Sequence, residues 1–232
     1  MRNIKHLSFD VWLTLIRSNP DFKKVRTHLI KTLFDIPSSF EEVEKTVAEQ
    51  DRLFTLLNEK TGKNIDREEM LLLMLAQLKV DISLITMRQI DDFFRKLESA
   101  FWRYQPFFID DDLEEIFIKA KENNISLSIF SNTGLIRGHI LSYFFENRGL
   151  SEYFDFELYS DELDISKPSI LAFETILERV LRLKKVERAS VCHIGDNLVA
   201  DVEGAINFGF SALHYDCKLL KMNDLLEKNG IF

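Results

Sequence analysis

Oxygen-bearing side chains and one lysine follow the apolar stretches of this sequence. They are Asp10, Ser131, Asn132, Lys167, Asp196 and Asp201. The carboxylates of Asp10 and Asp196 are suited to Mg²⁺, which prefers oxygen ligands and keeps waters available for a phosphate. Lys167 and the Ser131 hydroxyl could hold phosphate oxygens. The residue types therefore indicate Mg²⁺-dependent chemistry on a phosphorylated group, provided that the fold brings them together.

The order of the predicted strands and helices indicates how these residues come together. The predicted strands are residues 4–9, 125–130, 156–159, 190–194 and 211–215, and the predicted helices between them are 111–123, 135–145, 168–183 and 199–208. Alternation of this kind predicts an α/β fold with a Rossmann-like parallel sheet. In such sheets, ligands bind at the carboxyl ends of the strands, which is where the candidate residues stand.

A long helical stretch separates the first strand from the rest of the sheet. Its expected helix starts are Pro20 after Asn19, Ser39 with Glu42, Asp66 with Glu69, and Ser83. No strand pattern interrupts them, so we expect an inserted helical bundle. The predicted division is an α/β core from residues 1–16 and 106–232, and a helical domain from 17–105.

These residues, taken in order, resemble the four motifs of the haloacid dehalogenase-like hydrolase superfamily. The matching segments are DVWLT from residue 10, Ser131 in SIFSN, Lys167 before Pro168, and GDNLVAD with Asp196 and Asp201. The likeness covers about residues 4–16 and 106–216. The helical stretch lies where this superfamily has its C1 cap.

The resemblance implies a nucleophile and a metal site. Asp10 would attack phosphorus and become an aspartyl-phosphate, so that hydrolysis is split into two steps. Asp10, the backbone carbonyl of Trp12 and Asp196 would hold Mg²⁺.

It also implies how the transferring phosphoryl group is bound. Ser131, Asn132 and the neighbouring amides would contact its oxygens. Lys167 would compensate the negative charge, Asp201 would orient Lys167 or a metal-bound water, and Thr14 would support the loop behind the nucleophile.

The first motif departs from the family pattern at Trp12 and Leu13. The phosphatases of this family carry an aspartate in place of Trp12, which protonates the leaving group, and an indole N–H cannot exchange a proton near neutral pH. Loss of a general acid slows a reaction by about 10² to 10⁴. Leu13 stands where the family usually has glycine.

Three functions follow in order of preference. The first is a Mg²⁺-dependent phosphatase acting on a small phosphorylated metabolite. The second is a catalytically weak or inactive binding or regulatory protein on the same scaffold, which Trp12 motivates. The third is a 2-haloacid dehalogenase, whose branch carries tyrosine at the position of Trp12 and needs no metal.

A third branch of the family, the phosphonate hydrolases, also lacks the acid and uses a cap lysine. The corresponding candidates are Lys23, Lys24 and Lys31. His193, in a predicted strand, is interpreted as a buried, hydrogen-bonded core residue.

Composition narrows the setting. The net charge of −8 argues against an electrostatic nucleic-acid partner. The longest apolar run, residues 70–76, is too short for a membrane span, and no signal peptide is visible. Cys192 and Cys217 lack a metal-ligand spacing, which favours a cytoplasmic protein. We expect a monomer or a homodimer.

Overall fold

The computed structural model describes residues 3–232, and its centre is a five-stranded parallel sheet in the order β5-β4-β1-β6-β7. The strands are β1 (His6–Phe9), β4 (Ser126–Ser131), β5 (Phe156–Tyr159), β6 (Val191–Gly195) and β7 (Ser211–His214). β1 pairs with β4 on one side and with β6 on the other. Every residue of β1, β4 and β6 is buried, as expected of strands covered on both faces. The predicted α/β class and parallel sheet are confirmed.

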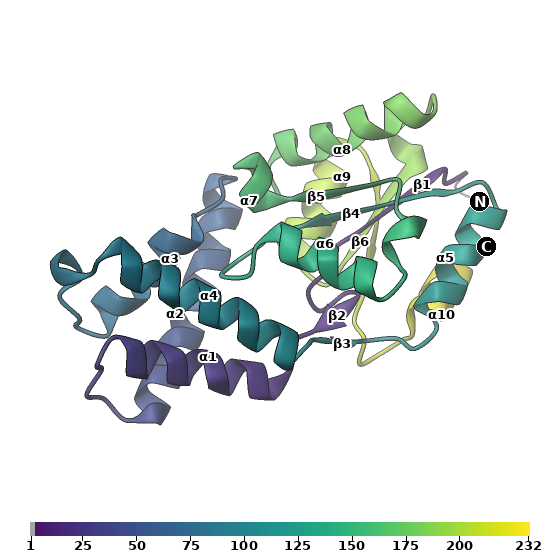
Figure 1. Ribbon diagram of the computed structural model, residues 1–232. Coiled ribbons are helices and arrows are strands. Elements are labelled where there is room, and N and C mark those ends of the chain that lie inside the picture. Colours follow the sequence, from purple (N-terminus) through teal and green to yellow (C-terminus); the bar gives the residue numbers. More distant parts are fainter. Residues whose placement is uncertain (1–2) are drawn as a thin grey trace.

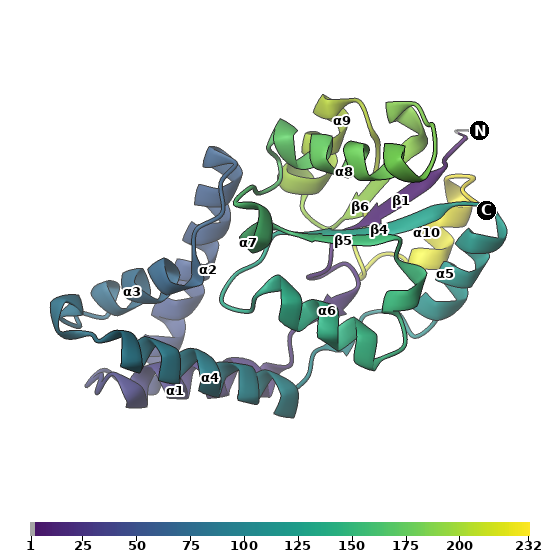
Figure 2. The same cartoon turned by 45° about the horizontal axis from the view of Figure 1, so that its top comes forward.

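Helices cover both faces of the sheet (Figures 1 and 2). α8 (Ile170–Leu183) and α9 (Gly204–Phe208) lie on one face, and α5 (Leu113–Glu122), α6 (Gly138–Asn147) and α10 (Met222–Lys228) lie on the other. The short helix α7 (Ser160–Leu163) follows β5, and a π-helical turn (Leu198–Glu203) leads into α9. This two-sided cover leaves the carboxyl ends of the strands as the place where loops can form a site.

Phenylalanine rings fill much of the interior. The fully buried ones include Phe9, Phe93, Phe101, Phe117, Phe130, Phe144, Phe145 and Phe173. Many meet edge to face, for example Phe144 and Phe145 with ring centroids 5.6 Å apart. This geometry suits the aromatic quadrupole and needs no polar partner.

The segment between β1 and α5 is helical, and we call α1–α4 the helical insertion. Its members are α1 (Pro20–Leu33), α2 (Phe40–Thr61), α3 (Arg67–Gln77) and α4 (Met87–Arg103). α1 begins at Pro20 with Asn19 as its N-cap, and α2 begins after Ser39 with both bonds of the Ser39–Glu42 capping box formed. These two starts agree with the sequence prediction.

The predicted start of the fourth helix at Ser83 is wrong. Ser83 lies in a single 3₁₀ turn (Ile82–Leu84), where its N–H donates to the Asp81 side chain. α4 begins after Thr86, which forms a capping box with Gln89. The sequence offers two start signals close together, and the reciprocal cap has the longer apolar face behind it.

A small feature joins the helical insertion to the α/β part. β2 (Ile16–Arg17) and β3 (Phe107–Phe108) pair antiparallel, with Ile16 opposite Phe108. The chain leaves the α/β part through β2 and returns through β3. Strands of two residues carry no detectable alternation, so sequence patterns do not predict this ribbon.

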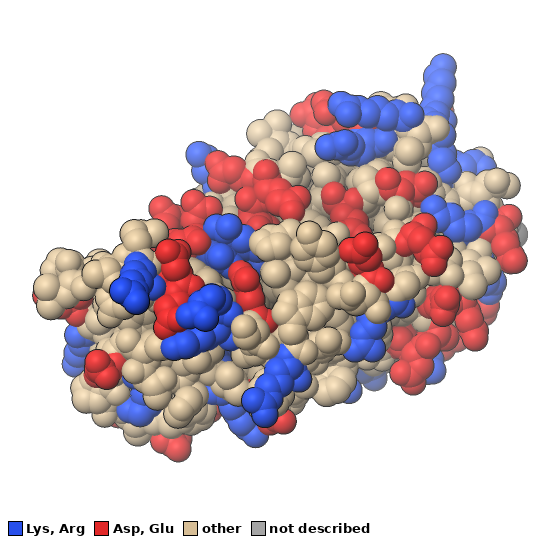
Figure 3. Space-filling model, viewed as in Figure 1, with Lys and Arg blue, Asp and Glu red and all other residues tan. Residues whose placement is uncertain are grey.

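The surface is mixed in charge. Figure 3 shows Lys and Arg side chains interspersed with Asp and Glu over the face seen in Figure 1. Within residues 3–232, no helix combines the length and the apolar character that a bilayer span requires.

Candidate functional site

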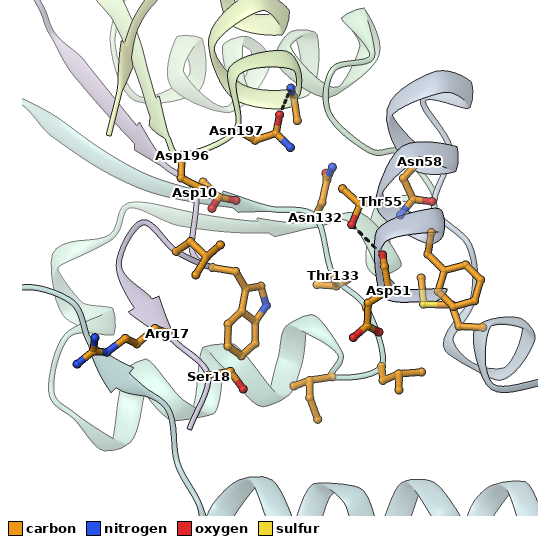
Figure 4. Close-up of a pocket in the computed structure, with 18 of the residues that line it drawn as sticks. Asp10, Arg17, Ser18, Asp51, Thr55, Asn58, Asn132, Thr133, Asp196 and Asn197 are labelled. Carbon is orange, nitrogen blue, oxygen red and sulfur yellow. Dashed lines mark hydrogen bonds between the residues drawn. The ribbon is translucent and has the colours of Figure 1, made fainter. Parts of the chain in front are cut away.

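A cavity of about 490 Å³ lies between the carboxyl edge of the sheet and the helical insertion. From the α/β part it is lined by Asp10, Asn132, Lys167, Asp196 and Asp201, among others. Figure 4 shows Asp10, Asn132 and Asp196 in this lining. The sheet therefore brings five of the predicted site residues to one place, although they are separated by up to 191 positions in the chain.

Lys167 connects the carboxylates beneath this cavity. Its Nζ lies 2.9 Å from Asp10 Oδ1, 2.7 Å from Asp201 Oδ1 and 2.7 Å from the Phe130 carbonyl oxygen. The side chain is only 1% exposed. Burial lowers the pKa of Lys167, but Asp10 and Asp201 outweigh burial and hold that pKa above its ordinary value. The ammonium is therefore charged near neutral pH and neutralises part of the acidic cluster.

Asp201 is held by contacts on both of its oxygens. Oδ1 accepts from Lys167 and lies 3.2 Å from His193 Nε2, while Oδ2 accepts the Asn197 N–H at 3.0 Å. Burial raises the pKa of Asp201, but Lys167 and His193 bring it well below its ordinary value. Because both oxygens are engaged, Asp201 is placed to orient Lys167.

His193 is buried on β6 directly behind this ion pair. Its Nδ1 lies 3.0 Å from the Ser8 hydroxyl, and its Nε2 lies 3.2 Å from Asp201 and 3.4 Å from Lys167. Burial lowers the pKa of His193, as does the neighbouring Lys167. The neutral ring can accept from Ser8 and donate to Asp201. His193 is the buried, hydrogen-bonded residue that we expected. It also supports Asp201 and Lys167 from behind, a role that its position in a strand does not predict.

Asp10 and Asp196 carry charge that the surrounding protein leaves only partly compensated. Burial, together with Asp201 and Asp196, raises the pKa of Asp10 to about 7 despite Lys167. Burial and Asp201 raise the pKa of Asp196 to about 6. Asp10, Asp196 and Asp201 each offer an oxygen within 4.8 Å of the others. An all-oxygen donor set with excess negative charge fits a hard divalent cation such as Mg²⁺.

The loop after Asp10 has an unusual backbone. Leu13 has φ of 63°, in the left-handed region that favours glycine, and its N–H donates to the Ile16 carbonyl at 2.7 Å. Trp12 and Leu13 both line the cavity. Thr14 is fully buried behind the loop, and its hydroxyl has no partner among the described residues. Leucine therefore stands in a backbone conformation that glycine adopts more readily.

The two predicted phosphate-binding residues differ in position. Ser131 is fully buried, does not line the cavity, and donates to the Asn132 carbonyl at 3.3 Å. Asn132 lines the cavity, and its side-chain amide pairs with the backbone of Lys167 in both directions, at 2.8 and 2.9 Å. In this structure Asn132 fixes the segment that carries Lys167.

The three lysines of α1 also separate. Lys23 is exposed and lines the cavity. Lys24 lies 3.4 Å from Asp21, and Lys31 donates to the Ile36 and Ser38 carbonyls beyond the end of its helix. Of the three, only Lys23 is placed to meet a ligand in the cavity.

Apart from Lys23, the residues of the opposite wall of the cavity were not predicted. The helical insertion contributes Phe22, Lys23, Arg26, Asp51, Phe54, Thr55, Asn58 and Met70. Asp51, Thr55 and Asn58 follow each other at helical spacing on α2, and this spacing is the one sequence signal that could have identified them. Taken alone, it resembles any polar face of a helix.

Known proteins are similar to this chain in sequence. The chain is 29% identical over 138 residues to an uncharacterized protein of Saccharomyces cerevisiae, YMR130W, a match that spans 54% of this chain and 44% of the yeast protein. It is 27% identical over 231 residues to the glyceraldehyde 3-phosphate phosphatase of Methanothermobacter thermautotrophicus, with 98% of this chain and 93% of that protein covered.

A solved structure shows the same fold. The magnesium-bound protein YfnB of Bacillus subtilis superposes with a TM-score of 0.67 at 18% identity, covering 98% of this chain and 99% of that one. A family model described as haloacid dehalogenase-like hydrolase matches residues 4–209, from β1 to the end of α9. With the motifs in order and the acidic cluster at the sheet edge, the chain belongs to the haloacid dehalogenase-like hydrolases.

Proposed function

We propose that this hydrolase is a Mg²⁺-dependent phosphatase that acts on a small phosphate monoester through Asp10. The observation that carries the proposal is the buried Lys167 ammonium between Asp10 and Asp201, with Asp196 beside them. The similarity to a phosphatase over nearly the whole chain supports the same class of reaction.

In the proposed mechanism, a carboxylate oxygen of Asp10 attacks phosphorus. The bond from phosphorus to the alcohol oxygen breaks as the bond to Asp10 forms, which gives an aspartyl-phosphate and the alcohol. Water then attacks the phosphoryl group, restores the Asp10 carboxylate and releases inorganic phosphate. Lys167 partly offsets the burial that raises the pKa of Asp10 and would place positive charge beside the phosphoryl group, and Asp201 holds Lys167 in place.

The residues that would hold Mg²⁺ are Asp10, Asp196 and the backbone carbonyl of Trp12. The bound cation would neutralise charge between Asp10 and the phosphate. Asp201 is left out of this set because both of its oxygens already accept hydrogen bonds. The phosphoryl oxygens would meet Asn132 and the neighbouring backbone, with Ser131 behind them.

We propose that the helical insertion acts as the C1 cap. It meets the α/β part around the cavity through Glu59 with Asn197 at 2.6 Å and Glu68 with Arg137 at 3.1 Å. Closing this side would exclude water while the aspartyl-phosphate forms.

Trp12 favours a second candidate, a binding or regulatory protein with weak activity. Its indole N–H can donate a hydrogen bond but cannot transfer a proton to the departing alcohol. We infer that any hydrolysis relies on water to protonate the departing alcohol and is correspondingly slow.

The direct test is a set of phosphate monoesters assayed with Mg²⁺, comparing the wild type with Asp10→Asn. We expect turnover by the wild type and its loss in the variant, because the amide is a poor nucleophile. Equal and negligible turnover for both would favour the second candidate. Chloride release from a 2-haloacid without metal would favour a dehalogenase instead.

Metal binding can be tested without turnover. We expect Mg²⁺ to raise the melting temperature of the wild type, because a cation that binds only the folded state stabilises it by mass action. Asp196→Asn should abolish most of this rise, whereas Asp216→Asn, outside the acidic cluster, should keep it. An identical Mg²⁺ response in Asp196→Asn would contradict the metal assignment.

A further inference from the structure

One face of α2 forms the cavity wall opposite Asp10. Asp51, Thr55 and Asn58 lie one above the other on this helix and all line the cavity (Figure 4). Residues at this spacing share a helix face. A group attached to a phosphate bound near Asp10 would extend toward these three side chains.

The side chain of Asn58 is buried, and its amide oxygen lacks a hydrogen-bond partner. It is only 4% exposed, and its Oδ1 is fully buried and unpaired within the described chain. A buried amide that lacks partners costs about 1–3 kcal/mol. In Figure 4 the Asn58 amide lies at the edge of the cavity beside Thr55. Asn58 is therefore a polar group placed in this wall whose hydrogen bonds remain to be made.

The charged and polar side chains around Asn58 determine which ligand groups this wall can bind. Asp51 is paired with the Arg26 guanidinium at 2.8 and 3.3 Å, so the two charges compensate each other. The Asp51 side chain is still 40% exposed, which leaves lone pairs free for hydroxyl donors. The Thr55 hydroxyl donates to the Asp51 carbonyl and can accept from a ligand. Lys23 is exposed, and water screens its charge.

Apolar side chains complete the wall. Phe22, Phe54 and Met70 are buried and line the cavity beside the polar groups. They suit the carbon skeleton of a ligand, whereas the α2 face suits its oxygens. A hydroxyl can donate to Asp51 and both donate to and accept from an amide, whereas a carboxylate only accepts and leaves Asp51 and the unpaired Asn58 Oδ1 without a donor.

We propose, resting on the phosphatase function proposed above, that the leaving group is a neutral polyol or sugar whose hydroxyls bind Asp51, Thr55 and Asn58. The cavity volume lies in the range of small-molecule sites. The α2 face discriminates against substrates that carry a carboxylate next to the phosphate.

Two matched probes test this selectivity. Glycerol phosphate and phosphoglycerate differ in whether the terminal carbon carries a hydroxyl or a carboxylate. We expect the wild type to favour glycerol phosphate at least about tenfold in kcat/KM.

Asn58→Leu should lower kcat/KM for glycerol phosphate by about 10- to 100-fold, the effect of losing a buried hydrogen bond worth about 1–3 kcal/mol. Activity on phenyl phosphate, which has no hydroxyl for Asn58, should change less than about threefold.

Thr61→Val is the control on the same helix. The Thr61 hydroxyl donates to the Leu57 carbonyl and lies outside the cavity. This variant should keep the selectivity of the wild type.

Binding separates this proposal from the phosphatase function. The affinities of Asp10→Asn for the two probes can be measured by calorimetry whether or not the wild type turns them over. A preference for glycerol phosphate that Asn58→Leu removes supports the proposal even if hydrolysis is absent. It is overturned if the carboxylate probe binds as tightly, if neither probe binds, or if Asn58→Leu leaves the preference intact.

Discussion

Leu13 holds a backbone conformation that its own side chain disfavours. A non-glycine residue in the left-handed region costs roughly 1–2 kcal/mol, and the Leu13 side chain is 55% exposed, so it recovers little by burial. We predict that Leu13→Gly leaves the free energy of unfolding unchanged or raises it by up to about 1 kcal/mol, since greater freedom of glycine in the unfolded chain offsets part of the gain. Urea unfolding of Leu13→Gly and Leu13→Val measures this. The Leu13→Val variant should be less stable than the wild type. If the wild type were more stable than Leu13→Gly by more than about 1 kcal/mol, the backbone at Leu13 would not be strained.

Trp12 occupies the position of the missing acid. We predict that Trp12→Asp raises kcat for a phosphate ester with a poor leaving group by about 10² to 10⁴, the range of general acid catalysis. An ester of a phenol, which needs little protonation, should gain much less and is the control. Rates for both esters, measured with Mg²⁺ in both proteins, check this. Equal gains for the two esters would show that Trp12 limits something other than proton transfer.

At the scale of elements, the end of β6 depends on one glycine. A Cβ at Gly195 would lie 2.1–2.6 Å from the Asp201 side chain, which occupies that space to reach Lys167. We predict that Gly195→Ala lowers the free energy of unfolding by about 1–3 kcal/mol and reduces activity, because Asp201 must move.

Gly134→Ala is the matched control for that substitution. A Cβ there would meet no atom within 4 Å, although Gly134 also lines the cavity. Its stability and activity should stay close to wild type. Thermal unfolding of the two variants makes the comparison, and equal stabilities would refute the proposed role of Gly195.

The elements that sequence patterns identified are those with a strong local signal. Buried strands such as β6 were predicted within one residue, and the start of α2 was predicted at its reciprocal cap. The start of α4 was missed because Ser83 offered a competing local bond. The β2–β3 ribbon was missed because its pairing is non-local.

The candidate site follows the same rule. The strand ends could be predicted because parallel strands align their carboxyl ends at one edge. Asn58 could not, because it resembles an ordinary polar residue of a helix until the fold places α2 across the cavity from the edge of the sheet. The burial of Ser131 likewise could not be predicted from its position at a strand end.

For the molecule as a whole, a buried histidine links stability to pH. His6 is fully buried between Ser126 and Ser128, at 2.7 and 2.8 Å, and burial lowers its pKa from 6.5 to about 3. In the unfolded chain His6 is protonated below about pH 6.5, whereas in the folded chain it stays neutral until about pH 3. The contribution of neutral His6 to the free energy of unfolding is therefore complete above about pH 6.5 and is lost as the pH falls. At pH 5 the loss is about 2 kcal/mol.

Urea unfolding at pH 7.5 and pH 5 tests this link. We predict that the wild type loses about 2 kcal/mol more between the two pH values than His6→Gln does. His28→Gln, on the exposed face of α1, should behave as wild type. Equal losses in wild type and His6→Gln would show that His6 does not set the acid limit.

The β2–β3 ribbon makes the helical insertion an exchangeable part. Its exit and return strands are paired, so its two ends stand about 5 Å apart, and a different helical unit could be spliced between Arg17 and Phe107 without disturbing the order of the main sheet. Simple excision is another matter, because Phe101 of α4 packs edge to face on Phe144 of α6 and removal would expose that ring to water. A graft must therefore supply its own apolar residue over Phe144, and acceptors for Asn197 and Arg137 in place of Glu59 and Glu68.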